Sequence, residues 1–101
     1  MRWPFKDKRI EWSEEKNREL LHSRGVSFND VALAIEKDEI IDILPHWNKG
    51  RFGHQEIIVL ELNGYIHVVP CVVDNEKVFL KTIFAHRDVA KRYLLDNEDQ
   101  L

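Results

Sequence analysis

The sequence contains only one cysteine, four glycines and three prolines in 101 residues. The lone Cys71 excludes an internal disulfide, and its place in an apolar run is typical of a small buried side chain in a reducing compartment. No apolar run approaches the roughly 20 residues of a membrane-spanning helix, and the charged first residues lack the hydrophobic region of an export signal. We therefore expect one cytoplasmic domain over residues 1–101, with no membrane contact.

An excess of positive charge is also missing, because fifteen Lys and Arg stand against eighteen Asp and Glu. This balance disfavours a protein that binds nucleic acid through bulk charge alone. The charges are nevertheless segregated: residues 1–10 and 46–54 are basic, whereas residues 36–42 are acidic. A fold that brings the basic segments together would present one positive face.

Common catalytic and metal-binding motifs are absent. The sequence has no Gly-rich phosphate loop and no HExxH, CxxC or GxSxG motif. Cys71 and His67 make a poor nucleophile pair, because four residues of strand separate them by about 13 Å. The eight-residue gap between His46 and His54 matches no compact zinc pattern. We predict neither a metal nor another cofactor.

Capping residues indicate two N-terminal helices. Ser13 is a predicted N-cap followed by two acids, and Gly25 is a predicted left-handed stop, so the first helix spans about 14–24. Ser27 caps a second helix with an apolar stripe. A last helix is expected over about 87–95, followed by an acidic tail, 96–101, that frays.

Between these helices the apolar period changes to that of strands, which we expect over 40–44, 55–62, 65–73 and 78–84. The Asn63-Gly64 pair predicts a two-residue hairpin turn between the second and third strands. Helices and strands in separate blocks indicate an α+β fold, in which two N-terminal helices pack on a twisted antiparallel sheet of about four strands, followed by a C-terminal helix.

The predicted sheet is apolar on both faces. The hairpin pairs Leu62 with Tyr65 and Leu60 with His67 on one face, and the next strand would add Val78, Leu80, Thr82 and Phe84. The opposite face would hold Ile57, Val59, Glu61, Ile66, Val68, Phe79, Lys81 and Ile83. Because an antiparallel sheet commonly has one polar face, we expect the last helix or a partner protein to cover the second face.

Two segments combine cations with rings. Residues 46–54 interleave Lys49 and Arg51 with aromatic residues and glycines, as in segments that hold phosphate and stack on unpaired bases. The alternative is a solvated connection whose aromatic side chains fold back into the core. The second segment surrounds the start of the last helix, where a solvated helix face is the alternative, and contains Lys81, His86, Arg87, Lys91 and Arg92.

These residue types suit metal-free RNA cleavage. Attack of a 2′-hydroxyl on the adjacent phosphate needs a general base, a general acid and cations beside the phosphate oxygens. His54 or His86 could transfer the protons. The positive charge could come from Arg51, Lys81 and Arg87.

The order of short motifs resembles that of known small toxins. Ile10-Glu11-Trp12, then Lys16, then residues 24–28 (RGVSF) resemble the opening of BrnT-type toxins, which read F-E-W-D, a Lys four residues after the Trp, and K-H-G-V-x-F. Asn63-Gly64-Tyr65 and residues 78–84 (VFLKTIF), with Arg87 and Tyr93, resemble a related group that reads F-L-K-T-I, P-S-R and a closing Lys and Tyr. The chain departs from these patterns at Ile10, Ser13, Arg24 and Ala85-His86, where they have Phe, Asp, His and Pro-Ser.

The resemblance implies the RelE/ParE-like toxin fold and membership of a type II toxin-antitoxin pair. The implied activity is a metal-independent endoribonuclease that inhibits translation, acting on free or ribosome-associated RNA. A cognate antitoxin with a ribbon-helix-helix DNA-binding part would neutralise it. By position, Lys16, Lys81 and Arg87 match the family pattern. With the residue chemistry above, the catalytic candidates are Lys81, His86, Arg87 and His54, and the nucleic-acid contacts are Lys16, Lys49, Arg51 and Lys91.

Two rival functions stay open. A toxin of the same fold can act on DNA, by nicking it or by poisoning gyrase, and a non-catalytic protein-interaction module would also explain an apolar second face. We expect Lys81 and Arg87 to bind phosphate. We also expect an acidic amphipathic segment of the antitoxin to cover the apolar face and to pair with these two cations.

Overall fold

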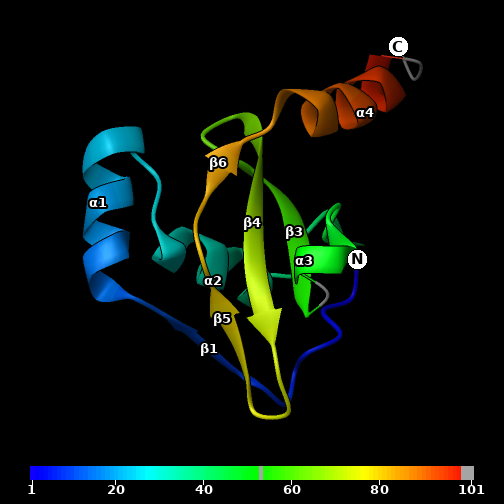
Figure 1. Ribbon diagram of the computed structural model, residues 1–101. Helices are drawn as coiled ribbons and strands as arrows, with labels where there is room; N and C mark the ends of the chain where they lie inside the picture. Colours follow the sequence, from blue (N-terminus) through cyan, green and yellow to red (C-terminus); the bar gives the residue numbers. More distant parts are fainter. Residues whose placement is uncertain (53, 99–101) are drawn as a thin grey trace.

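The computed structural model describes residues 1–52 and 54–98. Figure 1 shows a central sheet with α2 behind it, α3 in front of it, α1 beside one edge and α4 at one end. The architecture of these residues is mixed α+β, as predicted, but the sheet has six strands rather than about four, and there are four helices rather than three. The elements are β1 (Arg9–Trp12), α1 (Glu14–Arg24), α2 (Phe28–Glu36), β2 (Asp42–Pro45), α3 (Lys49–Phe52), β3 (Gln55–Leu62), β4 (Tyr65–Val73), β5 (Lys77–Leu80), β6 (Phe84–Ala85) and α4 (Arg87–Glu98).

The first two helices begin where the capping residues predict. The Ser13 hydroxyl accepts the backbone N–H of Lys16 at 3.2 Å, and Gly25 has the left-handed φ of 69° that ends α1. The Ser27 hydroxyl accepts the N–H of Asp30 at 3.2 Å in the same way. Each hydroxyl thus satisfies a backbone donor that the first turn of a helix leaves without an internal partner.

The sheet is built around the predicted hairpin. Asn63 and Gly64 have φ values of 55° and 79°, as a type I′ turn requires. Leu62 pairs with Tyr65 across the turn, which confirms the expected register of β3 and β4. The strand order is β1-β5-β4-β3-β2, and β6 pairs with β4 beyond the end of β5. Every pair is antiparallel except β1 with β5.

Two short elements were not predicted from the sequence. Strand β1 pairs in parallel with β5, Ile10 opposite Val78, and α3 forms inside the 46–54 segment. Strand β1 has four residues and finds its partner about 70 residues further along the chain, so no local pattern indicates it. The first predicted strand, 40–44, is instead β2 at Asp42–Pro45.

A β-bulge separates β5 from β6. Leu80 lies opposite Cys71, whereas Phe84 lies opposite Val68. The four residue steps from Leu80 to Phe84 therefore face the three steps from Cys71 to Val68 on β4, so the β5–β6 segment contains one extra residue. An extra residue moves all later side chains to the other face of the sheet.

The bulge lies opposite a proline and overturns part of the predicted faces. Pro70 accepts the N–H of Lys81 at 2.9 Å through its carbonyl oxygen, but it has no N–H to donate to the strand beside it. Regular pairing stops at this point. Ile83 is consequently buried in the cluster on the helix α2 side, and Phe84 packs in the cluster on the other side, the reverse of the predicted assignment.

Buried side chains form one cluster on each side of the sheet. The larger cluster joins the sheet to α1, α2 and the N-terminal segment, and it includes Trp3, Leu20, Phe28, Val31, Leu60, Cys71 and Leu80. In the smaller cluster, Val89, Ala90 and Tyr93 of α4 pack with Ile57, Val59, Ile66 and Val68. Helix α4 therefore covers the apolar centre of the second face. The expectation that an antitoxin covers this centre is wrong for these four sheet residues, because they are already buried.

Helix α4 is longer than predicted. It spans Arg87–Glu98, so residues 96–98 of the predicted frayed tail continue the helix, while residues 99–101 of that tail lie outside the described residues. None of the helices in the described ranges is long and apolar enough to cross a membrane.

Candidate nucleic-acid interface

Four rings form a row on the α4 side of the sheet. Trp47, which follows β2, packs between His46 and His86, with centroid distances of 5.1 and 5.0 Å. The ring of His86 also lies 6.1 Å from that of Phe84. Trp47 is 55% exposed, whereas His46 is only 8% exposed. This ring row, residues 46, 47, 84 and 86, therefore presents one large open indole supported from two sides.

Backbone hydrogen bonds determine the tautomers of both histidines in the row. Nδ1 of His86 accepts the N–H of Val89 at 3.3 Å, and Nδ1 of His46 accepts the N–H of Asn48 at 3.0 Å. A nitrogen that accepts a hydrogen bond carries no proton, so we assign the proton of each neutral ring to Nε2. His86 thus caps α4 through Nδ1 and offers an Nε2–H donor. This donor suits a phosphate oxygen, whereas a general base needs a lone pair.

Lys81 is exposed at the bulge on the same side of the sheet. Its Nζ lies 5.7 Å from the ring centre of Phe79. Its backbone N–H donates to the Pro70 carbonyl oxygen. Ala85, which precedes His86, pairs with His67, three residues from Pro70 on β4. Three residues of strand span about 10 Å. Lys81 and His86 are therefore placed along one edge of the sheet. Their spacing suits contacts with neighbouring parts of one extended nucleic-acid strand.

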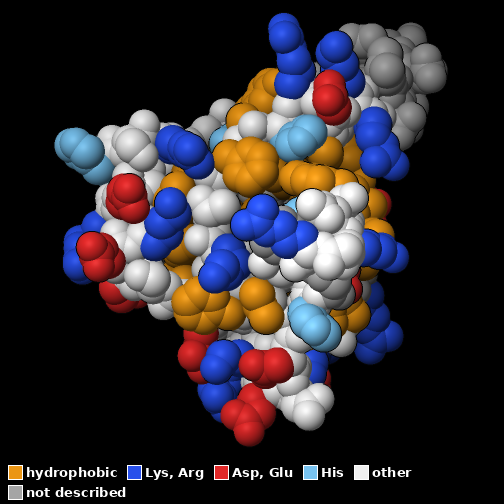
Figure 2. Space-filling model, viewed as in Figure 1, with side chains coloured by type: hydrophobic (Ala, Val, Ile, Leu, Met, Phe, Trp, Pro, Cys, Tyr) orange, Lys and Arg blue, Asp and Glu red, His pale blue; other side chains and the backbone are white. Residues whose placement is uncertain are grey.

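Further cations surround the ring row. Arg87 and Lys91 are exposed one turn apart on α4, and Lys49 and Arg51 are exposed on α3. Figure 2 shows this side of the molecule: Lys and Arg side chains are interspersed with hydrophobic ones, and the acidic side chains lie mostly toward the margins. Cations of residues 46–54 and of α4 thus lie on this side although the net charge is −3. Arg2, Lys6 and Lys8 of the basic segment 1–10 line a pocket on the other side, so the two basic segments do not form the single positive face that the sequence suggested.

Two predicted site residues are not brought into the row. Lys16 lies in the first turn of α1, where its Nζ is 3.9 Å from a carboxylate oxygen of Glu19. His54 is exposed directly before β3. Within the described ranges, no hydrogen bond or ring contact joins either residue to Trp47. The His54 ring makes no hydrogen bond with a described residue, so both of its nitrogens are open.

The Cys71 thiol is not a nucleophile. It is fully buried, and burial raises its pKa to about 12, with a smaller contribution from the nearby carboxylate of Glu56. His67, the other member of the weak candidate pair, uses Nδ1 to donate to the Tyr65 carbonyl oxygen at 2.9 Å. Neither group belongs to the ring row.

Arg24 has a structural contact. Its Nη1 donates to the carbonyl oxygen of Ile83 at 2.6 Å and joins the end of α1 to the segment between the bulge and β6. The BrnT-type pattern has a His at this position. Here the arginine holds α1 beside the edge that carries Lys81.

Sequence reasoning missed the ring row as a unit. It selected residues 46–54 and the start of the last helix separately, because each mixes cations with rings. The contact of Trp47 with His86 joins segments about 40 residues apart, and no local pattern shows it. The only signal in the sequence was the composition of each of these two segments, in which cations lie beside aromatic or histidine rings.

No metal centre is assigned. Across residues 1–52 and 54–98, no three His, Cys, Asp or Glu side chains come together in a way that could hold a metal ion.

Known proteins supply no further constraint on this surface. No family model, no curated protein and no solved structure matches the chain. The fold and the site therefore define a mixed α+β protein with an open indole, two flanking histidines and a rim of cations.

Proposed function

We propose that this protein is the toxin of a type II toxin-antitoxin pair and acts as a metal-independent endoribonuclease that inhibits translation. The observation that carries the proposal is the exposed indole of Trp47, held between His46 and His86 among cations. A base stacked on an aromatic ring gains about 1–3 kcal/mol. Stacking on Trp47 would place the adjoining phosphates beside the donors of the rim.

Each residue near the row has a distinct role in this proposal. The Nε2–H of His86 donates to a phosphate oxygen, and Arg87 stabilises the negative charge that develops there. Lys81, about 10 Å along the edge, holds a flanking phosphate. Lys49, Arg51 and Lys91 extend the contact with the nucleic-acid backbone, and Lys16, on α1, would reach only a longer RNA.

The proposed reaction uses the RNA's own nucleophile. The 2′-oxygen attacks the adjacent phosphorus, the bond to the 5′-oxygen breaks, and a 2′,3′-cyclic phosphate forms. In this proposal His54, whose ring makes no hydrogen bond with a described residue, takes the proton of the 2′-hydroxyl, which requires the RNA to reach from the ring row to the start of β3. The leaving 5′-oxygen takes a proton from solvent. DNA lacks this hydroxyl, so the chemistry favours RNA over DNA as the substrate.

The cognate antitoxin would compete with RNA for the same surface. Because α4 buries the apolar centre of the second face, the available apolar groups are Trp47 and the half-buried Phe79 and Val72. An acidic segment could cover these groups and pair with Lys81 and Arg87. A ribbon-helix-helix part of the same antitoxin would bind DNA.

The first prediction compares two exposed aromatic residues. Trp47→Ala should weaken cleavage of a labelled single-stranded RNA by about 5- to 100-fold, because a stacked base is lost. The matched control is Tyr65→Ala: Tyr65 is 41% exposed and also packs beside a histidine, but it lies at the hairpin turn. Thermal melting checks that both variants are folded. Equal activity of wild type and Trp47→Ala would contradict the proposal.

The same assay separates the rival functions. RNA cleavage that leaves a 2′,3′-cyclic phosphate, and no cleavage of the 2′-O-methylated RNA, is expected for the proposed enzyme. Cleavage of the matching DNA, or an SOS response on expression without loss of mRNA, would indicate a toxin that acts on DNA. No effect on growth and no nuclease activity would indicate a protein-interaction module.

A further inference from the structure

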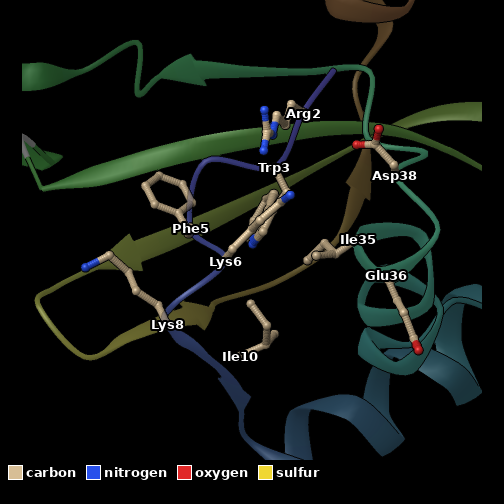
Figure 3. A pocket seen from close by; sticks show the side chains of 9 residues that line it. All are labelled: Arg2, Trp3, Phe5, Lys6, Lys8, Ile10, Ile35, Glu36 and Asp38. Atoms are coloured by element: carbon tan, nitrogen blue, oxygen red, sulfur yellow. The ribbon is translucent and has the colours of Figure 1, made fainter.

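A pocket lies between the N-terminal segment and the end of α2, on the side of the sheet opposite the ring row. Its volume is about 540 Å³, within the range of about 300–1,000 Å³ that small-molecule sites occupy. Trp3, Phe5, Ile10 and Ile35 form an apolar floor. The complete lining, shown in Figure 3, is Arg2, Trp3, Phe5, Lys6, Lys8, Ile10, Ile35, Glu36 and Asp38.

The indole N–H of Trp3 has no acceptor in the described residues. Trp3 is 94% buried, since only 6% of it is exposed. In the described part of the chain, every fully buried side-chain nitrogen or oxygen has a hydrogen-bond partner. The Trp3 N–H must therefore keep access to solvent, and Trp3 gains this access through the pocket that it lines. A ligand oxygen that enters the pocket could accept this N–H.

Two of the cations around the pocket, Arg2 and Lys6, are also open. Arg2 and Lys6 are exposed and form no ion pair or side-chain hydrogen bond with described residues. Lys8 points to the β4–β5 turn, where its Nζ donates to the Asp74 carbonyl oxygen at 2.6 Å. Figure 3 shows the acids Glu36 and Asp38 on the α2 side, and Lys8 on the opposite side. The side chains of Trp3, Arg2 and Lys6 thus line one cavity, and their donors have no acceptor among the described residues.

We propose that this pocket binds a small organic carboxylate with an apolar body. A carboxylate oxygen accepts the Trp3 N–H, its charge faces Lys6 and Arg2, and the apolar body packs on Ile10 and Ile35. A single negative charge suits the pocket better than a phosphate ester, because the two acids on the α2 side oppose a second charge. This site is separate from the ring row and does not depend on the proposed nuclease function.

The test uses the three indole N–H signals of the ¹⁵N-labelled full chain. Trp12→Phe and Trp47→Phe variants assign them. Titration with 3-phenylpropionate should move the Trp3 signal saturably, with a dissociation constant on the order of 1 mM for a ligand of this size. The Trp12 N–H, which already donates to Glu14, should not move. The matched probe 3-phenyl-1-propanol, which has the same body without charge, should bind at least about fivefold more weakly.

Two substitutions test the charged side of the pocket. Lys6→Gln and Arg2→Gln should each weaken binding of 3-phenylpropionate by about 3- to 10-fold, whereas Lys37→Gln, outside the lining, should not. No saturable shift up to about 20 mM, or equal binding of the acid and the alcohol, would overturn the proposal. Binding of an acidic peptide but not of the small acid would also overturn it and indicate a protein partner. The nuclease variant Trp47→Ala should bind 3-phenylpropionate like wild type, so the two proposals fail independently.

Discussion

At the scale of single residues, His86 combines two tasks. Its Nδ1 accepts the Val89 N–H at the start of α4, and its ring supports Trp47. The first task stabilises the fold and the second shapes the exposed surface. Loss of activity after a simple truncation would therefore be ambiguous, because removal of a helix N-cap costs about 0.5–2 kcal/mol.

A pair of substitutions at this position separates the two tasks. Asn is a good N-cap but has no aromatic ring, so His86→Asn should melt close to wild type and still lose most RNA cleavage. His86→Ala should lose both activity and about 0.5–2 kcal/mol of unfolding free energy. Denaturant unfolding and the RNA assay measure the two effects. If His86→Asn retained full activity, neither the ring nor Nε2 would have a role.

Lys81 and Arg87 give a second prediction at this scale. Alanine at either position should relieve toxicity on induced expression, because each variant loses a phosphate contact. The thermal midpoint should change little, since exposed charges contribute little to stability. Arg18→Ala, a removal of an exposed charge on α1, is the matched control and should stay toxic. Full toxicity of both Lys81→Ala and Arg87→Ala would show that this site assignment is wrong.

At the scale of elements, the turns and caps were predictable and the bulge was not. Ser13, Gly25 and Asn63-Gly64 act within a few residues, so the sequence around them is sufficient to place α1 and the β3–β4 hairpin. Pro70 is visible in the sequence, but its effect depends on which strand lies beside it. The exposure of Lys81 follows from that pairing, and only the structure shows it.

The turn between β4 and β5 gives a pH-dependent prediction. Asp74 accepts the N–H groups of Glu76 and Lys77, both at 2.8 Å, and these bonds hold its pKa below the usual 3.8. The stabilisation is therefore fully present above that pH and is lost as the pH falls through the lower folded-state pKa. Wild type should lose stability on acidification below about pH 4 more steeply than Asp74→Asn, which keeps an acceptor oxygen but cannot protonate.

Thermal melting between about pH 2.5 and 5 measures this difference. The control is Asp7→Asn, because the Asp7 carboxylate has no hydrogen bond or ion pair with described residues. Its acid profile should follow that of wild type. Identical profiles for wild type and Asp74→Asn would contradict the assignment.

At the scale of the whole molecule, the two sides of the sheet carry different surfaces. The ring row and its cations lie on the α4 side, and the N-terminal pocket lies on the α2 side. The sequence predicted the cationic segments and four of the residues that surround the row. It could not predict their meeting point, because Trp47 and His86 come together only after the sheet has formed.

Hydrogen exchange of the protein alone and with the proposed antitoxin tests how the surface is covered. The candidate to be used is the product of a reading frame adjacent to the gene. Protection should increase in residues 47–51 and from Lys81 to Arg87, because the antitoxin is expected to bind these cations and the open indole. Residues 1–8 serve as the internal control and should not change. Protection confined to α1 and α2, or no binding, would contradict this mode of neutralisation.

The parallel pairing of β1 with β5 has a consequence for synthesis of the chain. The ribosome makes residues 9–12 early, but their partners, residues 77–80, emerge only after about three quarters of the chain. Until then β1 has no strand partner, and the backbone hydrogen bond from Arg9 to Glu76 cannot form. Contacts of such long sequence separation slow folding, because the intervening chain must lose entropy before they form. A nascent chain therefore acquires its paired β1 and its cationic edge together, in the last steps of folding, and truncated translation products would have neither.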